Sequence, residues 1–177
     1  MTNASSTIPP GFEGVTPMLA VPDSAAAIKF YKKAFGAVEV TRLTDPAGRI
    51  AHAEIKIGAA IVMLADENPK YNKTPATLGG TAVFLHIYVT DVDALAPKAI
   101  AAGAKMIFPI NDQFYGDRCC RLADPFGHIW IISTHKEDVS PEEMQTRFEK
   151  MCGAQPPVDK RGPVRETPQQ PGVSRQD

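Results

Sequence analysis

The sequence predicts an α+β protein made of two βαβββ modules, because the same series of elements occurs twice along the chain. Val21-Pro22-Asp23 precedes the first apolar helix and Val89-Thr90-Asp91 precedes the second. Three further pairs follow in the same order, namely Phe35-Gly36-Ala37 with Ala102-Gly103-Ala104, Arg49 with Arg118, and Gly58 with Gly127. The spacings of the four pairs are 68, 67, 69 and 69 residues. An ordered series at nearly constant spacing indicates an internal duplication.

Each module is expected to run strand, helix, strand, strand, strand. In the first, the apolar runs 16–21, 37–43, 49–57 and 59–65 predict strands, and 25–35 predicts a helix that begins after Asp23 or Ser24 and stops at Gly36. In the second, the strands are expected at 82–89, 104–110, 117–123 and 128–134. Its helix begins after Asp91 or Asp93. Pro97 would kink the helix in the first case and cost little in the second.

The composition changes at both ends of this repeated region. Residues 1–14 are polar with Pro and Gly, and we expect a flexible N-terminal arm there. One domain is expected over 15–137, with its modules at about 15–66 and 82–137. The segment 153–177 is rich in proline and nearly free of large apolar residues, which predicts a disordered tail.

A short C-terminal helix is predicted over 138–152, between the domain and the tail. Ser140 is a typical N-cap, Pro141 suits the first helical position, and Glu143 lies three residues after the cap. Met144, Phe148 and Met151 then recur at helical spacing. We expect this apolar face to pack on the domain or on a second chain.

Charge and composition exclude several classes of function. The net charge of −1 gives no electrostatic basis for binding nucleic acid or an anionic membrane. The N-terminus lacks the basic and apolar regions of a secretory signal, and no apolar run has the ~18 residues that cross a bilayer. Cys119, Cys120 and Cys152 show no zinc-binding spacing, which predicts reduced thiols in a cytoplasmic protein.

Four strings in fixed order, "VTDVDAL", "AAGA", "FYGDR" and "DPFGHIWIISTH", resemble the vicinal oxygen chelate superfamily. That superfamily includes glyoxalases, bleomycin-resistance proteins, fosfomycin-resistance enzymes and extradiol dioxygenases. The longer strings "FYGDRCCRLADPFGHIW" and "THKEDVSPEEM" resemble its PhnB-like branch more narrowly. The resemblance covers about residues 15–150. It implies two curved sheets, each with its helix on the convex side and ligands bound on the concave side.

The resemblance also implies four places for metal ligands, two in each module. In this sequence those places hold Thr16, Val62, Phe84 and Ile131. A catalytic divalent metal in this superfamily requires His and carboxylate donors, and threonine is a poor ligand while the other three side chains cannot ligate. We therefore expect neither the usual metal nor any other cofactor.

Strand alternation predicts which side chains line the concave face. Thr16, Met18, Val62, Phe84, Tyr88 and Ile131 would supply a mostly apolar wall, and His52, Glu54, His86 and Arg121 would supply polar groups. The repeat places Arg121 where the first module has His52. His128 and Trp130 are interpreted as structural, and Asp117 with Arg118 as a salt bridge.

Three functions remain open. The first is binding or sequestration of a small organic molecule, as in bleomycin-resistance proteins, for which Thr16, Met18, Phe84, His86, Tyr88, Arg121 and Ile131 are the candidate contacts. The second is metal-independent acid/base chemistry by His86 or His52. The third is a metal-dependent reaction like that of lactoylglutathione lyase, at a displaced site of His52, Glu54 and His86. Whichever applies, the resemblance implies a homodimer, because family pockets are often closed by a second chain.

Overall fold

A computed structural model describes residues 6–153. Apart from Gly153, the expected tail therefore lies outside the described residues, as does the start of the expected N-terminal arm. These described residues divide into two units, the first ending at Val139 and the second beginning at Ser140. No helix in the described part of the chain is long and apolar enough to cross a membrane.

The first module is a four-stranded sheet with one helix on it, as predicted. Its strands lie in the order β1-β4-β3-β2, with β1 parallel to β4 and the other pairs antiparallel. The elements are β1 (Met18–Val21), α1 (Ser24–Phe35), β2 (Val38–Thr44), β3 (Ile50–Ile57) and β4 (Ala60–Asp66).

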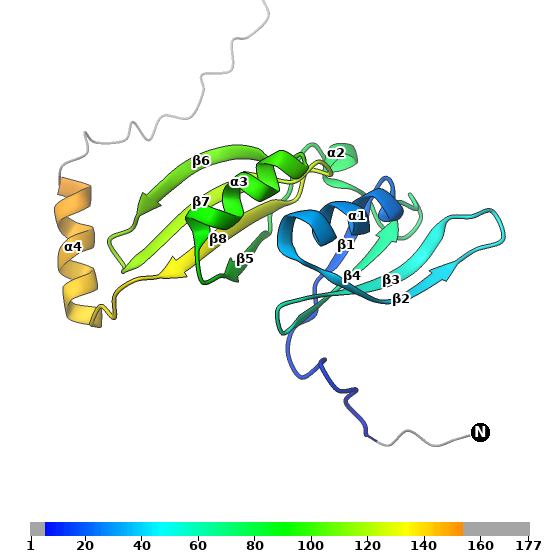
Figure 1. Ribbon diagram of the computed structural model, residues 1–177, viewed down its shortest axis with the longest axis horizontal. Helices are drawn as coiled ribbons and strands as arrows, with labels where there is room; N and C mark the ends of the chain where they lie inside the picture. The colour runs from blue at the N-terminus through cyan, green and yellow to red at the C-terminus, as the bar shows by residue number, and fades with distance from the viewer. Residues whose placement is uncertain (1–5, 154–177) are drawn as a thin grey trace, which may run out of the picture. The chain divides into compact units, whose positions relative to one another are not determined.

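The second module repeats this arrangement, with strand order β5-β8-β7-β6 and β5 parallel to β8. Its elements are β5 (Phe84–Tyr88), α3 (Val92–Ala102), β6 (Lys105–Asp112), β7 (Asp117–Ala123) and β8 (Ile129–His135). A short helix that the sequence did not predict, α2 (Pro75–Leu78), lies in the segment between the modules (Figure 1). The two-module α+β fold is thus confirmed.

An aspartate cap begins the long helix of each module. The side chain of Asp23 accepts a hydrogen bond from the backbone N–H of Ala26, and that of Asp91 accepts one from Ala94. Asp91, and not Asp93, is therefore the second cap. Pro97 accordingly lies inside α3, beyond the first turn, where proline removes one intrahelical hydrogen bond.

Matching hydrogen bonds in the two modules fix their correspondence at 68 residues. Asp66 Oδ1 accepts a bond of 2.7 Å from the N–H of Ser24, and Thr134 Oγ1 accepts one of 2.8 Å from the N–H of Val92. The spacing of 69 that the glycines suggested is therefore wrong for the last strands. The turn between β3 and β4 is shorter than the Asp124–His128 turn, so the two glycines do not occupy equivalent places.

One hydrophobic core lies between the helices and the sheets. α1 contacts α3, and the core combines apolar side chains of both modules, among them Leu19, Tyr31, Phe35, Leu64, Ala96, Ala99, Leu122, Trp130 and Ile132. Each sheet consequently turns one face toward the helices, and the opposite face, called here its outer face, carries no helix of the same unit (Figure 1). Trp130, 1% exposed, is a core residue as predicted.

The second unit contains α4 (Pro141–Gly153). Its predicted cap is confirmed, because the N–H of Glu143 donates to Ser140 Oγ at 3.2 Å. Every residue of α4 remains at least partly exposed, with Phe148 at 43% and Met151 at 40%. Packing of this face against a second chain stays a prediction.

Candidate functional site on the outer face of the second sheet

Side chains from all four strands meet on the outer face of the second sheet. One row across the sheet runs from Phe108 on β6 through Arg121 and Ile131 to His86 on β5. The next row brings Cys119, Ser133 and Tyr88 together, and Phe84 stands in the row on the other side. Five predicted contacts, Phe84, His86, Tyr88, Arg121 and Ile131, therefore share this face.

Arg121 holds the centre of the face between two aromatic rings. Its guanidinium carbon lies 5.2 Å from the centroid of the Phe84 ring and 4.9 Å from that of Phe108. Both distances are within the range of cation–π attraction. Phe108 was missed from the sequence because the strand β6 has two irregularities in its register, which interrupt the alternation used to assign its faces.

His86 is joined to two neighbours on the same face. Its Nε2 lies 2.7 Å from the hydroxyl of Ser133, and its ring stacks on that of Tyr88 with the centroids 4.8 Å apart. The contact between His86 and Tyr88 is therefore one of ring stacking. Because Ser133 is buried, its hydroxyl fixes the orientation of the imidazole and leaves Nδ1 on the side away from the serine.

Tyr88 is anchored by a buried carboxylate. Its hydroxyl donates to Asp117 Oδ2 at 2.7 Å, and Asp117 is only 3% exposed. This hydrogen bond raises the pKa of Tyr88, because the carboxylate stabilises the protonated phenol. Tyr88 therefore contributes a neutral hydroxyl and an aromatic surface, and not a tyrosinate base.

Asp117 also binds His135, so the predicted Asp117–Arg118 salt bridge is wrong. His135 Nδ1 lies 2.9 Å from Asp117 Oδ1, while Arg118 pairs with Asp93 and Asp112. The reason is alternation: neighbouring residues of β7 point to opposite faces of the sheet. The bonds to Asp117 and then to Asp138 raise the pKa of His135.

The outer face of the first sheet carries the other predicted polar pair. His52 Nε2 lies 3.1 Å from Glu54 Oε1, and both side chains are partly exposed. The pairings Glu54 with Met63 and Arg121 with Ile131 make Glu54, and not His52, the counterpart of Arg121. The predicted correspondence of Arg121 with His52 was wrong because the turn between β3 and β4 differs in length from the turn between β7 and β8.

Val62 is not part of any wall, contrary to the prediction. It is 5% exposed, pairs with Ile55 and belongs to the core. Met63 takes the place that corresponds to Ile131, because Met63 pairs with Glu54 as Ile131 pairs with Arg121. With this correction, the four places that the resemblance assigns to metal ligands hold Thr16, Met63, Phe84 and Ile131.

Such a set of side chains does not fit a catalytic divalent metal, which requires His and carboxylate donors. Among residues 6–153, no three His, Cys, Asp or Glu side chains are grouped so that they could hold a metal ion. In particular, one chain does not unite His86 with His52 and Glu54, because His86 belongs to the second sheet and the other two to the first.

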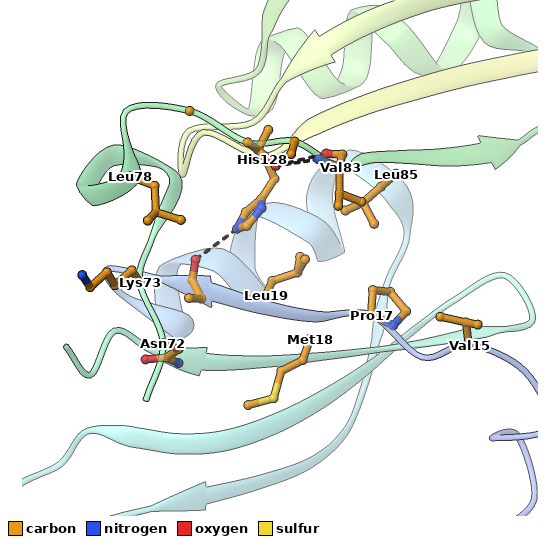
Figure 2. Close-up of a pocket in the computed structure, with 14 residues that line it drawn as sticks. Val15, Pro17, Met18, Leu19, Asn72, Lys73, Leu78, Val83, Leu85 and His128 are labelled. Carbon is orange, nitrogen blue, oxygen red and sulfur yellow. Dashed lines mark hydrogen bonds between the residues drawn. The ribbon is translucent and has the colours of Figure 1, made fainter. Parts of the chain in front are cut away.

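A cavity of about 600 Å³ lies elsewhere, where β1, the segment around α2 and the start of β5 meet. Its lining is mainly apolar and includes Met18, Leu19, Leu78, Val83 and Leu85. Figure 2 shows the ring of His128 at this cavity, with its Nε2 3.0 Å from the carbonyl oxygen of Ala20. His128 is structural, as interpreted from the sequence. Of the predicted contacts only Met18 lines this cavity.

The comparisons with known proteins agree with this architecture. The profile of the Glyoxalase/Bleomycin resistance protein/Dioxygenase superfamily matches residues 15–132. An uncharacterized protein of Mycobacterium tuberculosis is 44% identical over 135 residues, which cover 74% of this chain and 79% of that protein.

Two solved structures show the same fold. TioX from Micromonospora sp. ML1 is 30% identical with a TM-score of 0.55, and the match covers 69% of this chain and 99% of TioX. The gene product At5g48480 of Arabidopsis thaliana is 25% identical with a TM-score of 0.57, and the match covers 69% and 98% of the two chains. The protein belongs to the glyoxalase/bleomycin resistance protein/dioxygenase superfamily.

Proposed function

We propose that this protein binds a small organic molecule on the outer face of the second sheet, without the metal that many members of its superfamily use. The observation that carries the proposal is the row of Phe108, Arg121, Ile131 and His86 across the sheet, flanked by Phe84 and Tyr88. Ligand sites combine apolar walls with a few oriented polar groups, and this face has both.

A second copy of the chain closes the site in this proposal. One face of each module's helix is buried in the shared core, whereas the outer faces of the sheets expose large apolar side chains. On the first sheet these include Met18 at 55% and Leu43 at 60%, and on the second Phe84 at 48%, Phe108 at 54% and Tyr88 at 62%. An exposed apolar surface of this kind marks an interaction site. A homodimer that places the first sheet of one chain over the second sheet of its partner would cover both.

Metal-independent acid/base chemistry is the second candidate, and the geometry of His86 favours it. The imidazole is held by Ser133 and by the ring of Tyr88, which gives it a fixed orientation beside Ile131. Histidine is the side chain that most often serves as a general base in enzymes. Metal-dependent lyase chemistry like that of lactoylglutathione lyase is less well supported, because it needs a ligand set shared between two chains.

Membership of the narrower PhnB-like branch is also a proposal, and it rests on the sequences of residues 114–130 and 134–144. We further propose a cytoplasmic location, which suits a protein whose cysteines 119, 120 and 152 carry free thiols.

Three measurements test the proposed function. Elemental analysis of protein purified without chelator should find less than stoichiometric Zn, Ni, Mn or Fe. One equivalent of metal, with activity that is lost on chelation and restored on re-addition, would establish the lyase instead.

Sedimentation should show a dimer at tens of micromolar, and a monomer would contradict the shared site.

A thermal-shift screen of small organic molecules should give hits whose thermal shift disappears in the variant Phe84→Ala.

A further inference from the structure

We infer that the ligand of the outer face is an organic anion with a flat apolar body, whose carboxylate, phosphate or sulfonate group binds Arg121. The inference rests on the proposed function, because it names the class of molecule that the same site takes.

Arg121 differs from the other arginines that the structure describes. Arg42 pairs with Glu39, Arg49 with Asp45, Arg118 with Asp93 and Asp112, and Arg147 with Glu143. Within residues 6–153, Arg121 contacts aromatic rings and no carboxylate. Its N–H donors therefore have no anionic partner from the described part of the same chain, although a guanidinium pairs most strongly with one.

The surroundings of Arg121 favour an anion rather than a neutral group. Asp117 is the carboxylate of β7 on this face, and both of its oxygens are occupied by Tyr88 and His135. Lys105 stands in the row of Phe84 and adds a second positive charge at the edge of the sheet. Among the described residues of one chain, the charge near Arg121 is therefore positive, which attracts an anionic ligand.

The rings beside Arg121 select the body of the ligand. Phe84 and Phe108 lie on two sides of the guanidinium, and Ile131 separates it from His86 in the same row. Adjacent strands are about 4.8 Å apart, so roughly 10 Å separate Arg121 from His86 along the row. A planar ring system that lies on Ile131 would place an anionic substituent at Arg121 and its far edge near His86 and Tyr88.

Two fluorescent dyes that differ in one group test this inference on the full-length protein. Anilinonaphthalene sulfonate carries an anion, and phenylnaphthylamine has the same rings without it. At neutral pH and low salt, we expect the sulfonate to bind wild-type protein about tenfold more tightly or better. Arg121→Met should remove that preference and leave the affinity for the neutral dye within about twofold, since the rings remain. Arg118→Met is the matched control, because Arg118 lies on the other face, and it should change neither affinity.

The outcomes separate the two proposals. If both dyes bind equally well and Phe84→Ala weakens both, the site stands and its selectivity for anions is wrong. If Arg118→Met lowers the affinity for the sulfonate as much as Arg121→Met does, general charge attraction explains the preference and the inference fails. If neither dye binds, or no substitution on this face changes either affinity, the proposed site itself is wrong. The melting temperature of each variant shows that it is folded.

Discussion

The hydroxyl of Tyr31 on α1 donates a hydrogen bond of 2.6 Å to Asp124 Oδ2, at the turn before β8. The same oxygen accepts a bond of 3.0 Å from Trp130 Nε1, and Oδ1 accepts the N–H groups of Phe126 and His128. One buried carboxylate thus holds its own turn and links the two modules. Burial, with the charge of Asp124 as the second cause, raises the pKa of Tyr31 well above the usual value, so this phenol remains a donor.

Loss of the Tyr31 hydroxyl and loss of the Asp124 carboxylate should both destabilise the protein, but by different amounts. Tyr31→Phe deletes one bond to a charged group, at a cost of about 1–3 kcal/mol in the free energy of unfolding. Asp124→Ala leaves two buried side-chain donors unpaired, at a cost of about 2–6 kcal/mol. Urea unfolding measures both. The double variant should cost no more than Asp124→Ala plus a few tenths of a kcal/mol; full additivity would show that the two groups act independently.

Most of the fold could be predicted from the sequence, because helix caps and strand alternation are local signals and the ordered repeat can be read directly from the chain. The errors arose where a turn or a strand irregularity shifted the register. Because the turn at Gly58 is shorter than its counterpart, the predicted positions in β4 were wrong by one residue. The prediction therefore placed the core residue Val62 on the face where the structure has Met63. The irregular register of β6 hid Phe108 in the same way. The role of Asp117 could not be predicted at all, because Tyr88 and His135 approach it only in the folded sheet.

His135 should titrate above its ordinary pKa of about 6.5. Asp117 first, and Asp138 second, stabilise the imidazolium and raise the pKa of His135. A raised pKa in the folded state means that this contribution to stability is complete below the unfolded-state pKa and is lost as the pH rises through the folded-state value. Nuclear magnetic resonance of the ring protons measures the shift. Asp117→Asn should lower the pKa of His135, and an unchanged value would show that Asp117 does not cause it.

The three cysteines should differ sharply in reactivity. Cys152 is exposed on α4, whereas Cys119 and Cys120 are buried in β7. Burial also raises the pKa of Cys120 to about 11, and the thiol, which reacts only as the thiolate, is protonated at neutral pH. We expect one rapidly reacting thiol in native protein with a disulfide reagent and three after unfolding. The variant Cys152→Ser should abolish the rapid phase; a rapid phase that survives would place a reactive thiol in the sheet.

The contact of His86 with Ser133 gives the sharpest distinction between a binding group and a structural one. Ser133 is fully buried, and His86 is the side chain that reaches its hydroxyl. His86→Ala should leave that hydroxyl unpaired and cost about 1–3 kcal/mol, whereas His86→Gln offers a replacement partner and should cost about 0.5 kcal/mol or less.

Both substitutions of His86 should weaken the binding of anilinonaphthalene sulfonate, because both remove the ring that stacks on Tyr88. Urea unfolding and dye titration on the same samples separate the two effects. Ser133→Ala is the control: it releases His86 from its orientation while it keeps the ring, so it should affect dye binding less than either substitution of His86. If His86→Gln destabilises the fold strongly and leaves dye binding intact, His86 is a structural histidine, and the ligand must bind away from it.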